Sequence, residues 1–290
     1  MSIIWSKYVQ GTKTLYYSRK LRFDDIFVEQ FKPLFDIDEN SNLKILEIGC
    51  GPGALAGSLH RWYPKSEITA VDRDSEFIRF AKEHEKGITF LEGDATNLPF
   101  ENNSFDITIS NTVSEHIEPS VFYGEQQRVL KPGGVCLVLS SRKGININPS
   151  CITFNENEQQ FWKKVEQYDN SMKKYSVCQY PMSEAELPAA MEKYGFKNTS
   201  VGYATIDLTP DDPKFSAALA HDMINSNRYT ALDALESVLH TMPDHFTVDE
   251  VEEMKQLANA KYDIRIEQYD RNEKQWDTNV SIIMVVRGVK

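Results

Sequence analysis

The sequence predicts an α/β fold in which helices cover both faces of a seven-stranded, mostly parallel sheet, giving three layers. Strand-like apolar segments alternate with helix-like segments between residues 43 and 141. The first of these strands breaks into a glycine-rich turn that leads directly into a helix. Residues 135–140 (VCLVLS) are almost wholly apolar, which is typical of a central parallel strand buried on both faces.

The glycine-rich turn lies in residues 43–57, LKILEIGCGPGALAG, where Gly49, Gly51 and Gly53 occupy alternate positions. A strand, a glycine-rich turn and a helix in this order form the nucleotide-binding turn of open α/β sheets. Glycine allows positive φ and lets a ligand approach the backbone closely. Pro52 suits the first turn of the helix, where a missing N–H costs little.

Glu47 separates two interpretations of this turn. A dinucleotide site has the pattern G-x-G-x-x-G and seats a pyrophosphate on the helix N-terminus. This chain has G-x-G-x-G, with the acid Glu47 two residues before the first glycine. An anion repels a pyrophosphate and suits a ligand that carries an ammonium or a sulfonium. The turn therefore favours S-adenosylmethionine over NAD and disfavours an NAD-linked oxidoreductase.

The second strand is predicted at 67–71, after a helix over 54–62, and Asp72 follows at its carboxyl end. A doubly wound fold places its ribose-binding acid about 20 residues beyond the glycines. We therefore expect Asp72 to bind the ribose, because Asp74 and Ser75 are better placed to cap the next helix. The neighbouring Arg73 lies against the adenine face or is solvated.

The third strand, 88–91, follows a helix over 74–85 and ends in Glu92-Gly93-Asp94-Ala95. We expect Asp94 to accept a hydrogen bond from the adenine amino group, and the Ala95 N–H to donate to a ring nitrogen. The alternative is that Asp94 only forms a turn.

The fourth strand, 105–110, leads into Asn111, which we expect in the ligand crevice. A helix over 121–130 follows, closed by the turn 131–134 before the fifth strand. These repeats predict parallel strands with right-handed crossovers.

The N-terminal segment, residues 1–40, carries apolar side chains at helical spacing: Phe23, Phe27, Phe31 and Leu34. The simple interpretation is a helix packed across the sheet. The alternative is a lid that includes Tyr16, Tyr17 and Arg19. In that case Arg19 or Arg22 pairs with a ligand carboxylate.

The C-terminal half adds two strands, 198–206 and 280–287, and a helix over 182–196 whose capping box is Ser183 and Glu186. Two stretches exceed a minimal fold, one near 142–181 and one at 207–276, the second rich in helical patterns. They are predicted to build a substrate cap or to extend the core.

Composition limits the function. The chain has 290 residues and a formal net charge of −11, which argues against nucleic acid as a general partner. No signal peptide, no apolar window of membrane-spanning length and no metal-ligand spacing occurs. The four cysteines form no C-x-x-C pair, so we expect reduced, mostly buried thiols in a cytoplasmic protein: Cys50, Cys136, Cys151 and Cys178.

Five motifs, LEIGCGPGALA, AVDRD, GDATNLPF, FDITISNTVSEHI and RVLKPGG, make residues 43–141 resemble the class I S-adenosylmethionine-dependent methyltransferases. Within that family the chain looks most like the group that includes the ubiquinone/menaquinone biosynthesis methyltransferases. Ser114 departs from the apolar residue common there, which leaves the substrate side open.

The resemblance implies a Rossmann-like core whose last strand is antiparallel and inserted beside the fifth. It implies that the methionine part of the cofactor is bordered by Glu47, Gly49, Gly51 and Gly53, with Asn111 near it. It also implies that Asp72 holds the ribose, and that Asp94 and Ala95 hold the adenine edge.

The predicted organisation has three parts. Residues 1–40 form a helical lid segment; residues 41–206 and 277–290 form the methyltransferase core, with an insertion at about 142–181. Residues 207–276 form a helical insertion that covers the substrate.

The predicted activity is methyl transfer from S-adenosylmethionine to a small-molecule acceptor. The alternative is a methyltransferase-like regulatory protein that holds S-adenosylmethionine or S-adenosylhomocysteine without turnover. Methyl transfer is an in-line displacement and needs positioning more than it needs a metal. By motif position His116 and Glu115 are nearest the methyl group, but a structural role is favoured for both. We assign no catalytic base; the further candidates are Tyr17, Tyr203, His221, His240 and His245.

Overall fold

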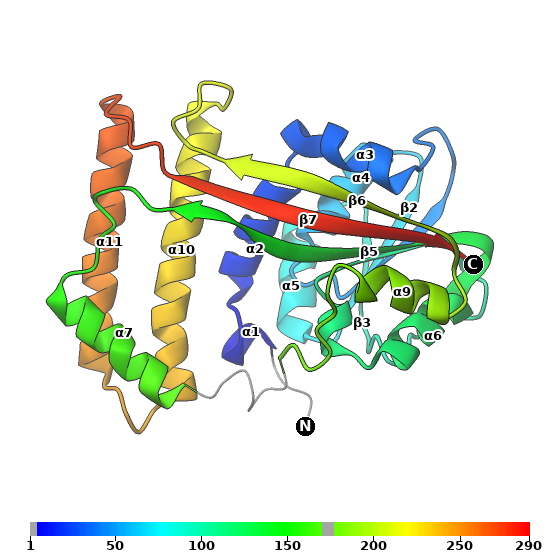
Figure 1. Ribbon diagram of the computed structural model, residues 1–290, viewed down its shortest axis with the longest axis horizontal. Coiled ribbons are helices and arrows are strands. Elements are labelled where there is room, and N and C mark those ends of the chain that lie inside the picture. The colour runs from blue at the N-terminus through cyan, green and yellow to red at the C-terminus, as the bar shows by residue number, and fades with distance from the viewer. Residues whose placement is uncertain (1–4, 170–176) are drawn as a thin grey trace. The chain divides into compact units, whose positions relative to one another are not determined.

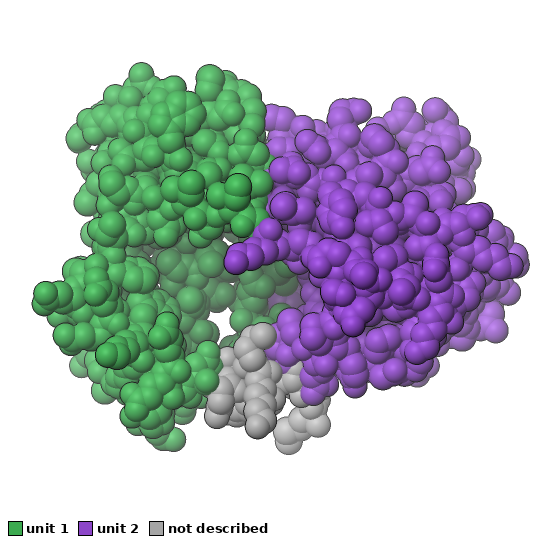
Figure 2. All heavy atoms as spheres, viewed as in Figure 1, with its two compact units in different colours: residues 1–21, 144–175, 207–280 green, residues 22–143, 176–206, 281–290 purple. Residues whose placement is uncertain are grey.

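The structure is a computed structural model that describes residues 5–169 and 177–290. The chain divides into two compact units, which Figure 2 colours separately and which are described one at a time below. Unit 2 carries most of the sheet and consists of residues 22–143, 176–206 and 281–290. Unit 1 is largely helical and consists of residues 1–21, 144–175 and 207–280.

Seven strands form one sheet in the order β3-β2-β1-β4-β5-β7-β6. Their bounds are β1 Lys44–Ile48, β2 Glu67–Asp72, β3 Thr89–Glu92, β4 Phe105–Asn111, β5 Leu130–Ile147, β6 Lys197–Leu208 and β7 Thr278–Val289. Strands β1 to β5 pair in parallel. Strand β7 runs opposite to its neighbours β5 and β6 (Figure 1). The prediction of a mostly parallel seven-stranded sheet is confirmed.

Helices cover both faces of this sheet in unit 2 (Figure 1). They are α3 Val28–Phe35, α4 Ala54–Trp62, α5 Ser75–His84, α6 Pro119–Val129 and α9 Glu186–Lys193. On one face, α6 and α9 share an apolar cluster with β5 and β7 that includes Phe122, Met191, Val138 and Met284. On the other face, α4 and α5 pack against β2 and β3. The three-layer α/β prediction is therefore confirmed.

Strand β5 is longer than predicted. The turn expected at residues 131–134 lies inside the strand, although Gly133 has φ of +77°. The Gly133 N–H donates to the Lys290 carbonyl at 3.1 Å, and the Lys290 N–H donates to the Gly134 carbonyl at 2.9 Å. Pairing with Lys290 thus keeps residues 131–134 within the strand. No sequence pattern near residue 131 indicates a partner so distant in the sequence.

The aromatic stripe of the N-terminal segment does not form one continuous helix. Asp24 caps a short 3₁₀ turn, η1 Asp25–Phe27, by accepting from the Ile26 N–H at 3.0 Å. The α-helix begins only at Val28. The aromatic side chains are nevertheless buried in unit 2, where Phe31 stacks on Trp62 with ring centroids 5.7 Å apart. The spacing of these aromatic residues therefore reflects their burial in unit 2 rather than one continuous helix.

Unit 1 is built from the helices α1 Trp5–Tyr8, α7 Glu156–Tyr168, α10 Ala217–Thr241 and α11 Val248–Asp270, with α2 Thr12–Arg22 up to Leu21. The first segment is tied to α10: the Gly11 N–H donates to Asp233 Oδ2 at 2.8 Å, and the ring of Tyr17 lies 5.3 Å from that of Tyr229. Residues 5–21 and the 207–276 insertion thus belong to one body, while their roles as lid and cap stay predictions.

A buried ionic cluster holds unit 1 together. Arg265 is fully buried and donates from Nε and Nη2 to Asp277 Oδ1 at 2.9 and 2.6 Å. Its Nη2 also donates to Asp211 Oδ2 at 2.9 Å. The same oxygen of Asp211 accepts from the backbone N–H groups of Gln275 and Trp276, both at 2.8 Å. The cluster therefore joins α11 to the segments that follow β6 and precede β7.

The four cysteines are free thiols: Cys50 and Cys136 are buried, Cys151 is half-buried and Cys178 is exposed. In the described ranges, no helix is both long and apolar enough to cross a bilayer. The same residues contain no cluster of histidine, cysteine and acidic side chains arranged to hold a metal ion.

Candidate functional site

The glycine turn lies at the carboxyl end of β1 and is hydrogen-bonded to β2. The N–H groups of Gly49 and Cys50 both donate to the Val71 carbonyl, at 2.8 and 3.0 Å. Gly49, Gly51 and Gly53 have φ of +68°, +53° and +88°, in the left-handed region that glycine adopts without strain. The turn thus delivers the chain directly into α4.

The turn is also tightly packed. A Cβ placed on Gly49 lies 2.5 Å from a methyl carbon of Val113, and one on Gly53 lies 2.9 Å from the Ala81 Cβ. Positive φ and close packing therefore both require glycine at these two positions.

Replacing Gly49 with alanine is expected to lower the free energy of unfolding by about 1–3 kcal/mol, because a left-handed alanine is strained. Gly124, inside α6, is the matched control, since a Cβ there meets nothing within 4 Å. Alanine at Gly124 is expected to stabilise the protein by about 0.5–1 kcal/mol. Urea unfolding of the two variants gives the comparison. Equal effects would contradict the requirement for glycine in the turn.

Glu47 is a buried acid beneath this turn, with only 2% of its surface exposed. The backbone N–H of Ala56, in the first turn of α4, donates to its carboxylate. The other oxygen, Oε2, has no partner in the part of the chain that the structure describes. Burial, and then the charge of Asp72, raise the pKa of Glu47 well above its usual value. An ionised Glu47 therefore needs a positive charge from outside the protein.

Asp72 ends β2 and organises the same turn. Its Oδ2 accepts from the Gly51 N–H at 2.8 Å, and its Oδ1 accepts from the Asp74 N–H at 2.9 Å. Burial raises the pKa of Asp72, and these two hydrogen bonds oppose that shift. Each oxygen keeps a lone pair for a further donor. Asp74 caps α5 by accepting from the Glu76 N–H at 3.0 Å, as predicted, while the ribose contact of Asp72 stays a prediction.

Asp94 lies just beyond β3, at the same edge of the sheet as Asp72. Asp72 pairs in register with Glu92, and the Gly93 N–H donates to the Asp72 carbonyl at 2.9 Å. The exposed side chain of Asp94 accepts through Oδ1 from the N–H and the hydroxyl of Thr96, both at 2.8 Å. Asp94 thus forms a turn with Thr96, as the alternative interpretation predicted. These hydrogen bonds use Oδ1 and leave the Oδ2 of Asp94 for another role.

Asn111 completes the row at the end of β4. Its side chain is 8% exposed, and its Oδ1 has no partner within the described segments. Ser110 Oγ, which the sequence did not single out, is likewise buried without a partner there. Ala95 is half-buried and packs beside the apolar cluster under β1 and β2. Arg73 is exposed, and its charge adds to the effect of burial, which lowers the pKa of His116.

His116 is fixed by a distant segment. The Cys178 N–H donates to His116 Nδ1 at 3.0 Å, and the Tyr180 N–H donates to the Glu115 carbonyl at 2.9 Å. Burial lowers the pKa of His116, which the charge of Glu115 opposes. A neutral imidazole that accepts at Nδ1 carries its proton on Nε2. In this arrangement His116 is an N–H donor rather than a base.

The other base candidates have their own partners. In unit 1, His221 Nε2 lies 2.8 Å from Asp270 Oδ1, and His245 stacks on Tyr168 at 3.8 Å. His240 lies 3.9 Å from Glu236, while Tyr203 is exposed on β6 in unit 2. No general base is assigned from these contacts.

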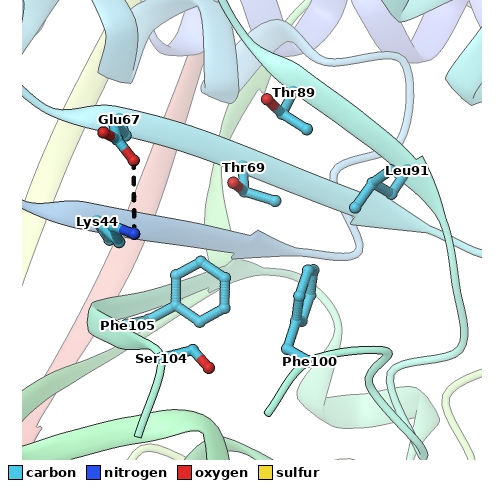
Figure 3. Close-up of a pocket in the computed structure, with 8 residues that line it drawn as sticks. All are labelled: Lys44, Glu67, Thr69, Thr89, Leu91, Phe100, Ser104 and Phe105. Carbon is cyan, nitrogen blue, oxygen red and sulfur yellow. Dashed lines mark ion pairs between the residues drawn. The ribbon is translucent and has the colours of Figure 1, made fainter.

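A groove of about 250 Å³ lies at the opposite edge of the sheet from the glycine turn. Figure 3 shows its walls: Lys44, Glu67, Thr69, Thr89, Leu91, Phe100, Ser104 and Phe105. Strands β1, β2 and β3 begin at Lys44, Glu67 and Thr89, so the groove lies at their amino ends. It shares no residue with the row formed by Glu47, Asp72, Asp94 and Asn111.

Residues 46–138 match a protein family described as "Methyltransferase domain". The chain is 37% identical over 108 residues to a fatty-acid O-methyltransferase of Mycolicibacterium smegmatis, covering 36% of this chain and 39% of that protein. It is 36% identical over 100 residues to a malonyl-[acyl-carrier protein] O-methyltransferase of Herminiimonas arsenicoxydans, covering 34% and 38%. The match thus spans well under half the length of these curated relatives.

Likeness in fold extends further. The structure of a Haemonchus contortus phosphoethanolamine N-methyltransferase 2 in complex with S-adenosyl-L-methionine aligns with 99% of this chain and 59% of that one. The TM-score is 0.52 and the sequence identity 19%. At that identity the likeness concerns the fold alone, and it supports a Rossmann-like α/β core.

Proposed function

We propose that this protein, whose residues 46–138 match the methyltransferase domain family, is an S-adenosylmethionine-dependent methyltransferase that acts on a small-molecule acceptor. One observation carries the proposal: beneath a left-handed glycine turn, Glu47 is a buried carboxylate whose Oε2 has no partner among the residues that the structure describes. A cationic ligand supplies the charge that this acid lacks, and a pyrophosphate does not. The named relatives, which are methyltransferases, support the same class of activity.

The residues at the carboxyl edge fit such a cofactor. Glu47 offers an acceptor to an ammonium group, and Asp72 has lone pairs for two ribose hydroxyls. The Oδ1 of Asn111 is a second buried acceptor near the methionine end. The left-handed glycines of the turn have no Cβ atoms that would stand between the backbone and the ligand. Asp94, Ala95 and Arg73 are proposed for the adenine side, where Asp94 acts through its free Oδ2.

When bound, S-adenosylmethionine supplies a methyl group on a sulfonium. The protein's part is to hold this group in line with the acceptor and to keep water out. Glu47 and Asp72 fix the two ends of the ligand, while Asn111 borders the reacting region. His116 keeps a structural role, in which its Nδ1 accepts from the Cys178 N–H.

Three narrower statements belong to the proposal. The motifs of residues 43–141 support a likeness to the ubiquinone/menaquinone biosynthesis group. A net charge of −11 favours a small molecule over nucleic acid as partner. The free thiols suit a reducing compartment, so we propose a cytoplasmic location.

Titration calorimetry with S-adenosylmethionine, S-adenosylhomocysteine and NADH tests the cofactor. We expect one-to-one binding of the first two and none of NADH. Release of S-adenosylhomocysteine in the presence of a metabolite panel then tests turnover. Binding of NADH alone would overturn the proposal. Cofactor binding without turnover on any acceptor would favour the regulatory alternative.

Asp72→Asn is expected to weaken S-adenosylmethionine binding about tenfold, because a charge-assisted hydrogen bond to the ribose becomes a neutral one. Glu67→Gln is the matched control, since Glu67 is an exposed acid at the other end of β2. Calorimetry should show no change in affinity for that variant. Similar losses in both variants would mean that net charge, and not a ribose contact, sets the affinity.

A further inference from the structure

Arg22 places a cation beside β5, just past the level at which β4 ends. Its Nη1 donates to Ser141 Oγ at 3.1 Å. Ser141 comes two residues after Leu139, which pairs in register with Asn111 on β4. Arg22 and Ser141 both belong to unit 2, and so do Glu47 and Asp72. The guanidinium therefore lies at the same sheet edge as the proposed cofactor residues, one strand beyond Asn111.

Arg22 lacks the acidic partner that other arginines of unit 2 have. Arg61 pairs with Asp25 at 3.1 Å, and Arg128 pairs with Glu125 at 2.7 Å. Among the described residues, no carboxylate lies within 4 Å of the Arg22 guanidinium. The side chain is half-buried, and burial lowers the pKa of Arg22. A cation withdrawn from water without a counter-ion is costly, and an anion brought by a ligand offsets that cost.

The order of the strands separates this cation from the acids. Along the edge, β2 carries Asp72, β1 carries Glu47, β4 carries Asn111, and β5 carries Ser141 with its bound Arg22. The proposed cofactor extends from β3 to β4, with its positive end over Glu47. The β5 position is therefore left for the methyl acceptor.

We propose that Arg22, oriented by Ser141, binds an anionic group of the methyl acceptor, so that the substrate is a small acid. The inference rests on the proposed function and names the substrate class of that site. The guanidinium fork suits a carboxylate or a phosphate, to either of which it donates two parallel hydrogen bonds. Arg22 is a positioning residue: it orients the acceptor toward the methyl group and takes no part in bond making.

The test measures anion binding to protein saturated with S-adenosylhomocysteine, with acetate and inorganic phosphate as probes and acetamide as the neutral match. Ionic strength is held constant with chloride. For wild type we expect a saturable rise in melting temperature with at least one of the two anions and none with acetamide. Arg22→Gln should weaken that anion at least tenfold, and Arg22→Lys should retain part of the affinity, because the charge remains while the fork is lost.

Arg79→Gln is the matched control. Arg79 is exposed on α5 and pairs with Glu76 and Glu83, so its loss changes the net charge equally. Anion binding by this variant should equal that of wild type. Circular dichroism melts of Arg22→Gln and Arg22→Lys establish that both are folded before anions are added.

A second arm identifies the source of the anion, because the cofactor has a carboxylate of its own. S-adenosylmethionine and its decarboxylated analogue are titrated into wild type and into Arg22→Gln. The proposal expects Arg22→Gln to leave both affinities unchanged. A loss confined to S-adenosylmethionine would assign Arg22 to the cofactor carboxylate and overturn the acceptor role.

The remaining outcomes are also decisive. Unchanged anion binding in Arg22→Gln, or no anion binding by wild type, would overturn the inference while the cofactor site stands. Failure of wild type to bind S-adenosylhomocysteine would overturn the proposed function itself.

Discussion

Replacing Glu47 with glutamine is expected to cost more than a hundredfold in S-adenosylmethionine affinity while leaving the chain at least as stable as wild type. In the proposed complex, the ammonium group of the cofactor compensates the charge of the buried carboxylate. Removing one partner of a buried ion pair typically costs about 3–5 kcal/mol, which exceeds two decades in affinity. In the free protein the same carboxylate is a burden, because its Oε2 has no partner among the described residues.

The pH dependence of stability follows from the raised pKa of Glu47. Between the usual pKa of a glutamate and the raised value, the folded state holds a proton that the unfolded state has lost. The free energy of unfolding therefore falls as pH rises through the folded-state pKa of Glu47. Glutamine does not titrate, so Glu47→Gln should lack this part of the slope. The stability gap in favour of the variant should widen from about pH 5 to about pH 8.

Calorimetry and urea unfolding at both pH values measure the two effects. Glu67→Gln is again the control, because it removes an exposed acid from the same sheet with little effect expected on either quantity. If Glu47→Gln were less stable than wild type at the higher pH, the buried carboxylate would not be destabilising in the free protein. If it bound the cofactor normally, Glu47 would not be the ammonium partner.

Replacing Arg265 with leucine is expected to lower the free energy of unfolding by about 3–5 kcal/mol, the largest stability effect that the structure predicts. The change leaves Asp211 and Asp277, which are 3% and 7% exposed, as two buried acids without their cation. Both must then take up protons or admit water. A second consequence is that the backbone at Gln275 and Trp276 loses its fixed acceptor geometry.

Arg271→Leu provides the comparison, since Arg271 is exposed at the end of α11 and pairs with Glu267 on the surface. Its loss should change stability by less than about 1 kcal/mol. The triple change of Arg265, Asp211 and Asp277 to apolar residues of similar size should recover part of the loss, because it removes the buried charges but leaves the Gln275 and Trp276 N–H groups without Asp211. Denaturant unfolding measures the free energy of unfolding of these variants. Equal destabilisation by Arg265→Leu and Arg271→Leu would show that the buried position of the cluster does not add to stability.

The sequence predicted the first half of the sheet closely because its signals are local. The helix expected at 54–62 is α4, since a glycine before it and Pro64 after it mark both ends. The sequence offered Asp74 and Ser75 as caps from their position, and the structure shows that Asp74 is the cap. By contrast, the length of β5 depends on Lys290, and the break before α3 depends on Asp24. Pairing partners that are distant in sequence leave no pattern near the residue they constrain.

The candidate site divides in the same way. The motif order indicated that Glu47, Asp72, Asp94 and Asn111 follow parallel strands, and parallel strands end at one edge. The sequence did not indicate that one carboxylate oxygen of Asp94 accepts from Thr96. Nor did it indicate that Glu47 accepts from a backbone N–H in the first turn of α4. It did not place Ser141 beside Arg22, because 119 residues separate the two. The cofactor contacts themselves stay predictions.

The strands β5, β6 and β7 each cross the boundary between unit 1 and unit 2, at residues 143–144, 206–207 and 280–281. During synthesis, segments of unit 1 and segments of unit 2 therefore emerge from the ribosome in turn. Strands β1 to β4 and their helices have all their neighbours early, whereas β7, which lies between β5 and β6, is synthesised after the other described strands. Contacts that join distant residues form slowly, since a long loop must close before they stabilise anything. Stop codons placed just before β7 should therefore yield chains that aggregate, and expressing either unit as a continuous fragment is ruled out by the order of its segments.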